Sequence, residues 1–235
     1  MKKIILFLTI VAAVGCLQAQ DELSTTPPTT RTRHFSVGVV GGFDRNYHSI
    51  DMAYMTDYSY DKYATGTTFG LQLAYHPWRW LALRADVVMI EKNYHRSHVF
   101  KYLPDPLPVT TTNDYLNVPV VLELSFGKNV RVNMFGGGYY GYWLKSHRVG
   151  KTYDFANNVV EFDEDMEFDE VRDNRVDMGF VYGAGLSAIL LDRIELGCEV
   201  KWYYGVNDIQ NPYMVHLRPR YNTTFAIQAC LSYWL

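Results

Sequence analysis

The sequence predicts an all-β fold, an eight-stranded antiparallel up-and-down transmembrane β-barrel, and three observations lead to this prediction. Eight segments alternate apolar and polar residues with the period of two that is typical of strands. The connections between these segments are alternately long and short. The charged residues near the middle of the segments fall on the parity opposite the apolar one. A charge facing lipid at mid-bilayer costs about 2–4 kcal/mol, so we expect the apolar parity to face lipid and the charged parity to face the lumen.

The final segment shows the alternation over its whole length. One parity of residues 220–235 runs from Tyr221 through Phe225 and Leu231 to Tyr233, while the other parity is mostly polar or small. Aromatic residues near both ends of the apolar parity are typical of a strand that crosses a bilayer. The eight predicted strands are residues 34–44, 63–76, 80–92, 115–126, 130–145, 176–190, 193–207 and 220–235.

The connections distinguish a membrane barrel from a soluble sandwich, whose strands also alternate. Tight turns at one end and long loops at the other are typical of outer-membrane barrels, with both chain ends on the periplasmic side. An even number of strands agrees with this architecture. The three short connections are residues 77–79, 127–129 and 191–192, and the four long ones are 45–62, 93–114, 146–175 and 208–219.

Composition supports the same class. The chain has 19 tyrosines and five tryptophans, and a membrane barrel needs such amphipathic rings at both interfaces. A net charge of −3 provides no basic footprint for nucleic acid, so we expect no nucleic-acid partner.

The N-terminal region predicts export. Residues 1–19 have two lysines, an apolar run too short to span a bilayer, and then small and polar residues, which together indicate a signal peptide cleaved after Ala19. Lipidation at Cys16 is the alternative. Residues 20–33 are expected to form a disordered periplasmic tail, and 34–235 the barrel domain. No later apolar stretch reaches 18 residues, so no transmembrane helix is expected. Cys198 and Cys230 point to opposite faces of neighbouring predicted strands, which argues against a disulfide.

The inward charges predict an ionic network in the lumen, because the interior of an eight-stranded barrel is just wide enough for side chains. Such a network could form a proton or ion path, or a salt-bridged plug, and we favour the plug. Pro119, which faces inward and cannot donate a ladder hydrogen bond, suggests a bulge. The predicted network residues are Arg84, Asp86, Glu123, Arg131, Glu199 and Lys201.

The third long connection contains an acidic loop. Carboxylates at this density could bind Ca²⁺ or bridge to cations on lipopolysaccharide. The loop lacks the glycine and the spacing of a Ca²⁺ loop, which favours a solvated acidic hairpin, and we predict neither a metal site nor a cofactor. The acidic residues are Glu161, Asp163, Glu164, Asp165, Glu167, Asp169 and Glu170.

Short pieces of sequence resemble the PorT-like family of small outer-membrane barrels, also called porin-like, over residues 35–235. The resemblance implies an outer-membrane location, and PorT itself is associated with a protein-secretion apparatus. The matching pieces are Phe35-Ser36-Val37-Gly38-Val39 with Gly41-Gly42, Tyr115-Leu116-Asn117-Val118-Pro119, Gly183-Ala184-Gly185, and Trp202-Tyr203-Tyr204-Gly205-Val206.

One pair of residues raises the possibility of an enzyme. His95 and Ser97 resemble the His-x-Ser pair of lipid A deacylase barrels. His95 lies 15 residues beyond Trp80, roughly 50 Å of strand before tilt at about 3.3 Å per residue, far above an apolar band about 25 Å tall. We therefore predict no enzyme.

The predicted function is that of a plugged outer-membrane barrel that acts structurally, or as an interaction or adhesion surface, through aromatic-rich extracellular loops. Expected partners are outer-membrane lipid and, through the loops, proteins or surface polysaccharide. The alternatives are a narrow porin-type channel and a membrane subunit of a secretion apparatus. The loop aromatics are Tyr47, Tyr54, Tyr58, Tyr60, Phe100 and Tyr102.

Overall fold

The structure, a computed structural model, describes residues 34–50, 59–98, 107–156, 158–171, 173–190, 193–209 and 220–235. Regular structure in these ranges is entirely β, and none of it is a helix long and apolar enough to cross a bilayer. The signal peptide and the tail predicted for residues 1–33 lie outside the described residues. The strands are β1 (Phe35–Ile50), β2 (Ser59–Trp78), β3 (Leu81–Glu91), β4 (Tyr94–His98), β5 (Leu107–Phe126), β6 (Val130–Tyr153), β7 (Val159–Asp165), β8 (Val176–Leu190), β9 (Ile194–Gly205) and β10 (Arg220–Trp234).

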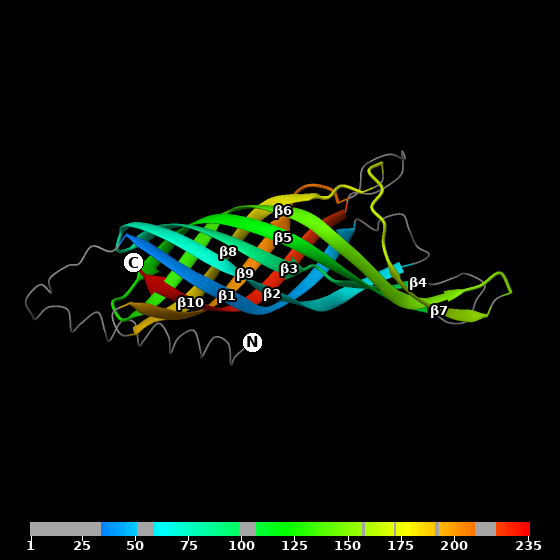
Figure 1. The fold of residues 1–235 in the computed structure, drawn as a ribbon, viewed down its shortest axis with the longest axis horizontal. Helices are drawn as coiled ribbons and strands as arrows, with labels where there is room; N and C mark the ends of the chain where they lie inside the picture. The colour runs from blue at the N-terminus through cyan, green and yellow to red at the C-terminus, as the bar shows by residue number, and fades with distance from the viewer. Residues whose placement is uncertain are drawn as a thin grey trace, which may run out of the picture.

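Eight of these strands close into a ring, which confirms the predicted barrel (Figure 1). Antiparallel pairs run from β1 through β2, β3, β5, β6, β8 and β9 to β10, and β10 pairs back with β1 from Ser36↔Trp234 to Ile50↔Arg220. The other two strands lie beyond this ring. β4 continues the line of β3 between β2 and β5, and β7 forms a hairpin with the end of β6.

The strands extend further at the long-loop end than predicted. β5 begins at Leu107, within the predicted loop 93–114, and β6 continues to Tyr153, within the predicted loop 146–175. The same two loops contain β4 and β7. The prediction failed here because strand ends outside the membrane do not bury one face in lipid, so they pair without the strong apolar alternation that marks a membrane strand.

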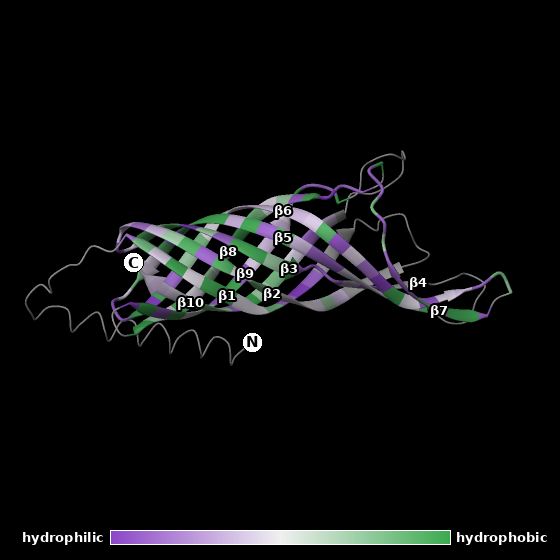
Figure 2. Ribbon diagram, in the orientation of Figure 1, coloured by the Kyte–Doolittle hydropathy of each residue, from purple (hydrophilic) through white to green (hydrophobic). Residues whose placement is uncertain are grey.

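The two faces of the wall separate by polarity as predicted. Outward side chains at alternate positions are strongly exposed, with Phe43 at 74% and Leu71 at 64%, whereas inward Thr224 and Asn117 are at 0%. Hydrophobic residues therefore recur along the strands around the barrel, as Figure 2 shows. Cys198 faces outward and Cys230 is buried, and both are free thiols, which confirms the expected opposite facing.

The predicted bulge at Pro119 is wrong. Both ladders of β5 keep one register across this residue, with Ala85↔Val120 and Val88↔Asn117 on one side and Pro119↔Tyr139 on the other. The missing donor is accommodated by a gap in the β3–β5 pairs between those two rather than by an extra residue. The register shift of β5 against β6 lies at Asp114/Tyr115.

Buried asparagine side chains hydrogen-bond the backbone where the strand is interrupted between β3 and β4. The Asn93 side chain donates to the Thr65 carbonyl at 2.9 Å, and its amide oxygen accepts the Asn113 N–H at 3.1 Å. The Asn113 amide in turn donates to the Lys92 carbonyl at 3.1 Å. Because these contacts satisfy backbone groups that an uninterrupted ladder would pair, the ladder is interrupted here without leaving these backbone groups unpaired.

Candidate functional site

Five charged side chains meet in the middle of the lumen. Arg84, only 1% exposed, donates to Glu123 at 2.6 Å and to both oxygens of Glu199 at 2.7 and 3.0 Å. Lys201 contacts Asp86 at 2.8 Å and Glu199 at 3.3 Å. β3 and β9 lie on opposite sides of the eight-stranded ring. These ion pairs therefore span the lumen, and we call the five residues the Arg84 cluster.

The Arg84 cluster also rests on an aromatic ring. The guanidinium carbon of Arg84 lies 4.5 Å from the centroid of the Phe135 ring, and Lys201 Nζ lies 5.7 Å from it. Cation–π contacts of this kind strengthen when the cation is desolvated. The cluster contains two cations and three carboxylates, and each carboxylate touches at least one cation.

Arg131 belongs to a separate group at the tight-turn end. Its guanidinium lies 3.9 Å from Glu195 and its central carbon 5.2 Å from the centroid of the Trp234 ring. Glu195 accepts hydrogen bonds from Ser187 at 2.6 Å and from the Trp234 indole at 2.8 Å. Five of the six predicted network residues thus lie in one cluster, whereas the sixth, Arg131, is buried in the lumen and ion-paired with Glu195 closer to the tight-turn end.

A second buried ion pair, not among the predicted site residues, lies towards the long-loop end. Lys92 Nζ is 2.5 Å from Asp177, and both side chains are 0% exposed. Asp177 also accepts from Tyr139 at 3.0 Å and from Asn222 at 2.9 Å, while Lys92 lies within 4.9 Å of the Tyr115 and Tyr139 ring centroids. Lys92 shares the inward parity of Arg84, so its parity could have identified it. The prediction omits it because Lys92 is the last residue of a predicted strand rather than a mid-strand charge.

Apolar and aromatic side chains, together with neutral polar ones such as Asn117, Thr224 and Gln228, fill much of the rest of the lumen. One buried cluster joins β1, β3 and β10, and a larger one includes Phe135, Tyr139 and Tyr203. Tyr139 and Tyr203 meet edge to face with 5.4 Å between ring centroids, and Tyr115 stacks on Trp143 at 5.7 Å. Ionic groups therefore alternate with packed rings along the barrel axis.

The segment between β7 and β8 packs onto the long-loop end of this filling. The Phe168 ring meets the Trp143 ring edge to face at 5.0 Å. The Arg175 guanidinium lies 4.2 Å from the Phe168 ring centroid and donates to the Trp143 carbonyl at 3.0 Å. Asn174 donates to the Asp208 carbonyl at 2.8 Å, which ties this segment to the chain that follows β9.

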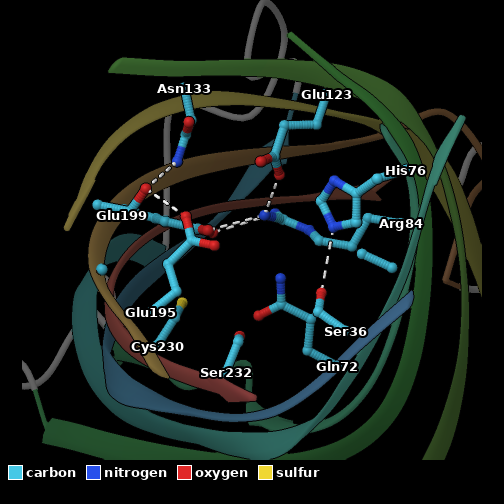
Figure 3. A pocket seen from close by; sticks show the side chains of 13 residues that line it. Ser36, Gln72, His76, Arg84, Glu123, Asn133, Glu195, Glu199, Cys230 and Ser232 are labelled. Atoms are coloured by element: carbon cyan, nitrogen blue, oxygen red, sulfur yellow. Dashed lines mark hydrogen bonds and ion pairs between the residues drawn. The ribbon is translucent and has the colours of Figure 1, made fainter. Parts of the chain in front are cut away.

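A small cavity lies among the polar side chains of the lumen. Its volume of about 30 Å³, between the Arg84 cluster and the tight-turn end, is enough for about two waters at roughly 10–15 Å³ each. Figure 3 shows its polar side chains converging from the surrounding strands. Arg84 Nε and Asn133 Oδ1 are buried without a hydrogen-bond partner, which is where ordered water is expected. The labelled lining residues are Ser36, Gln72, His76, Arg84, Glu123, Asn133, Glu195, Glu199, Cys230 and Ser232.

The acidic loop forms part of an exposed hairpin. Across β6 and β7, Lys151 pairs with Glu161 at 2.7 Å, and His147 contacts Asp163 at 3.0 Å and Asp165 at 2.7 Å. Hydrogen bonds from these basic residues hold the pKa values of Glu161 and Asp165 below their usual range.

The remaining acidic residues of the prediction either oppose β6 or follow β7. Glu164 lies opposite Arg148 in the hairpin ladder, whereas Glu167, Asp169 and Glu170 come after the strand. In the part of the chain that the structure describes, no three His, Cys, Asp or Glu residues are arranged to hold a metal ion.

The His-x-Ser pair and the loop aromatics are only partly described. His95 is exposed and its ring nitrogen lies 2.9 Å from the Thr110 hydroxyl. The Ser97 side chain lies outside the described residues. Of the loop aromatics, Tyr47 and Tyr60 belong to β1 and β2 through their backbone. Their side chains, and Tyr54, Tyr58, Phe100 and Tyr102 altogether, lie outside the described residues.

Solved structures that are similar to this chain include outer-membrane proteins. OprG from Pseudomonas aeruginosa is 13% identical, with 86% of this chain and 97% of OprG covered at a TM-score of 0.49. Ail of Yersinia pestis is 12% identical, with 85% and 99% covered at 0.40. The outer-membrane protease OmpT from Escherichia coli is 8% identical, with 90% and 100% covered at 0.45. No curated protein sequence matches this chain.

A family model, by contrast, covers most of the sequence. The model described as outer membrane protein beta-barrel domain matches residues 18–211, a span that includes every ring strand except β10. The closed ring, the outward apolar parity and the charged lumen are the features expected of such a domain. The chain therefore belongs to the outer membrane protein beta-barrel domain family and is an outer-membrane protein.

Proposed function

We propose that this protein is a non-enzymatic outer-membrane barrel with a lumen plugged by side chains, and that it acts structurally or as an interaction surface through its extracellular part. The filling of the lumen carries this proposal. Ion pairs cross the barrel at the Arg84 cluster and again at Lys92–Asp177, and packed rings lie between them. A permeating ion would have to displace these buried pairs.

The extracellular part supports the interaction role. β5 contains 20 residues, which at about 3.3 Å per residue and a tilt of about 35–45° gives a height of roughly 47–54 Å. An apolar band is about 25 Å tall, so roughly 22–29 Å of β5 extends beyond it. β2, β4, β5, β6 and β7 pair into one sheet at this end, which forms a wall large enough for protein or surface polysaccharide contacts.

We also propose that the chain belongs to the PorT-like group within this family. Such membership would make a subunit of a secretion apparatus the alternative function. A narrow channel would instead predict conductance, and a lipid A-modifying enzyme would predict an activity that is lost in Ser97→Ala. The small cavity argues against the channel, and the position of His95 on β4, outside the eight-stranded ring, argues against the enzyme.

Planar-bilayer recording of purified protein tests the plug. We expect no steady openings in the nanosiemens range, and such openings would refute the proposal. Arg84→Ala combined with Glu199→Ala is a matched variant that removes the central crossing pair. A small conductance appearing only in this variant would support the plug.

Crosslinking with mass spectrometry in native outer membranes tests the surface role. We expect crosslinks to partners from lysines of the projecting wall, such as Lys145 and Lys151. Crosslinks confined to the tight-turn end would contradict the proposed surface. Copurification of a defined set of secretion proteins would favour the role as a secretion subunit.

A further inference from the structure

Trp234, the last residue of β10, turns its side chain into the tight-turn end of the lumen. The alternation along β10 gives it the inward parity, whereas its neighbours Tyr233 and Leu235 are exposed. Trp234 is only 8% exposed, and the inward His76 and Arg131 near it are 8% and 7% exposed. These inward residues are therefore largely shielded from water although they lie at an end of the barrel.

Contacts from three other strands hold the Trp234 indole in this position. Its N–H donates to Glu195 of β9 at 2.8 Å. Its ring centroid lies 4.2 Å from that of His76 of β2 and 5.2 Å from the guanidinium carbon of Arg131 of β6. β2 and β6 are three strand junctions apart in the eight-stranded ring. The indole therefore extends across the mouth of the lumen rather than along its own strand.

The lumen cavity lies directly behind this indole. His76 and Glu195, which contact the indole, also line the cavity, and Figure 3 shows them on different sides of it. The next two inward residues of β10, Ser232 and Cys230, are lining residues as well. On the other side the cavity is lined by residues of the Arg84 cluster. Ion pairs thus bound the cavity towards the long loops, and the indole lies between it and the tight-turn end.

The backbone at Trp234 is tied to both neighbouring strands. The Trp234 N–H donates to the Arg193 carbonyl, next to β9, at 2.8 Å, and the Leu235 N–H donates to the Phe35 carbonyl of β1 at 3.0 Å. Side chains occupy discrete staggered rotamers, so the indole can change position by rotation about its side-chain bonds. Such a rotation breaks one hydrogen bond and two ring contacts, and it leaves the ladder of β10 intact.

We propose that Trp234 is a gate between the lumen cavity and the periplasm, the side on which the tight turns of such barrels lie. With the indole in place the cavity of about 30 Å³ holds only water. With the indole turned away, its polar lining becomes accessible to small polar solutes from the periplasm. The gate rests on the plugged lumen in one respect, because the Arg84 cluster must block the cavity from the long-loop end.

Chemical modification of Cys230 tests the gate, because this residue lines the cavity and is 6% exposed. In a C16S/C198S background Cys230 is the one cysteine left of three. The full-length protein in lipid vesicles is treated with methanethiosulfonate ethylammonium, a small water-soluble thiol reagent, and the modification is followed by mass spectrometry. We expect Trp234→Ala to be modified at least about tenfold faster than the parent, which corresponds to about 1.4 kcal/mol in the opening equilibrium.

Trp143→Ala is the matched control. Trp143 is also inward, is 6% exposed and stacks on Tyr115 at the long-loop end, so its removal should leave the rate at Cys230 unchanged. Equal increases in both variants would overturn the gate. An increase in Trp143→Ala alone would overturn the gate and refute the plugged lumen as well, whereas no increase in either variant would overturn the gate and leave the plug standing.

Two milder variants keep the test decisive if Trp234→Ala does not give the heat-modifiable electrophoretic mobility of a closed barrel. Trp234→Phe keeps an aromatic ring but removes the indole N–H, and Glu195→Gln removes the charge of the group that accepts this hydrogen bond. Each should raise the modification rate at Cys230 by roughly two- to tenfold, as expected for the weakening of one hydrogen bond. Rates equal to that of the parent in both folded variants would overturn the gate.

Discussion

Replacing Arg84 with methionine should destabilise the barrel strongly, because the substitution keeps the side-chain bulk but leaves buried carboxylates unpaired. In the native cluster two cations face three carboxylates, a net charge of −1. Arg84→Met leaves Lys201 against the same three carboxylates, a net charge of −2. Glu123 loses its 2.6 Å partner, and Glu199 loses contacts at 2.7 and 3.0 Å. Removing one partner of a buried ion pair costs about 3–5 kcal/mol, and we expect a loss of that size.

A triple variant tests whether the unpaired carboxylates cause this loss of stability. Arg84→Met with Glu123→Gln and Glu199→Gln leaves Lys201 and Asp86, a net charge of zero, so most of the lost stability should return. The assay is urea unfolding in lipid vesicles, followed by tryptophan fluorescence. Lys151→Met, which breaks an exposed pair with Glu161, is the control and should change the midpoint little. A single variant within about 1 kcal/mol of wild type, or a triple variant no more stable than the single one, would refute this reasoning.

Lys92→Met should cost about 3–5 kcal/mol by the same unfolding assay, because it leaves Asp177 buried without its cation, and a neutral result would contradict a buried ionic role. The pKa of Asp165 lies below its usual 3.8 because His147 and Lys145 bond it, so its contribution to the β6–β7 hairpin is complete above pH 3.8 and is lost as the pH falls below that value. Hydrogen exchange of β7 amides should then accelerate in acid, and unchanged exchange would refute the assignment. Gly127→Ala should cost about 1–3 kcal/mol because Gly127 has a φ of +115° and a Cβ there would clash with the Val130 carbonyl oxygen, and wild-type stability of the variant would contradict this.

The sequence predicted best those features that the bilayer enforces. Lipid contact makes one parity apolar, so the eight ring strands and the inward direction of Arg84, Asp86, Glu123, Glu199 and Lys201 could be read from alternation. It predicted worst the strand ends beyond the bilayer, such as 107–114 of β5 and β7, where pairing continues without lipid on one face.

To predict which charged residues of the lumen pair with one another, their positions along the barrel axis are needed as well as their parity. Parity says that Arg131 and Lys92 point inward, but it does not say how far along the axis each lies from Arg84. That distance depends on the stagger of the ladders, which places Arg131 beside Glu195 and Lys92 beside Asp177. Stagger is set by hydrogen-bond register between neighbouring strands, and register is not encoded in the spacing of residues along one strand.

The buried ion pairs of the lumen also stabilise the part of the barrel from which the strands of the long-loop end project. The Arg84 cluster links β3 and β5 to β9 across the lumen, and the Lys92–Asp177 pair links the residue that follows β3 to β8 nearer the long-loop end. Buried crossing pairs resist flattening of the ring, because flattening separates ions that cannot regain water. β3, β5 and β6 continue directly into or beside the projecting strands β4 and β7. Ion pairs at two positions along the barrel axis therefore hold the ring in shape where the projecting strands begin. The Lys92–Asp177 pair lies closer to the projecting strands than the Arg84 cluster does. Weakening it should therefore increase the mobility of those strands more than weakening the Arg84 cluster does.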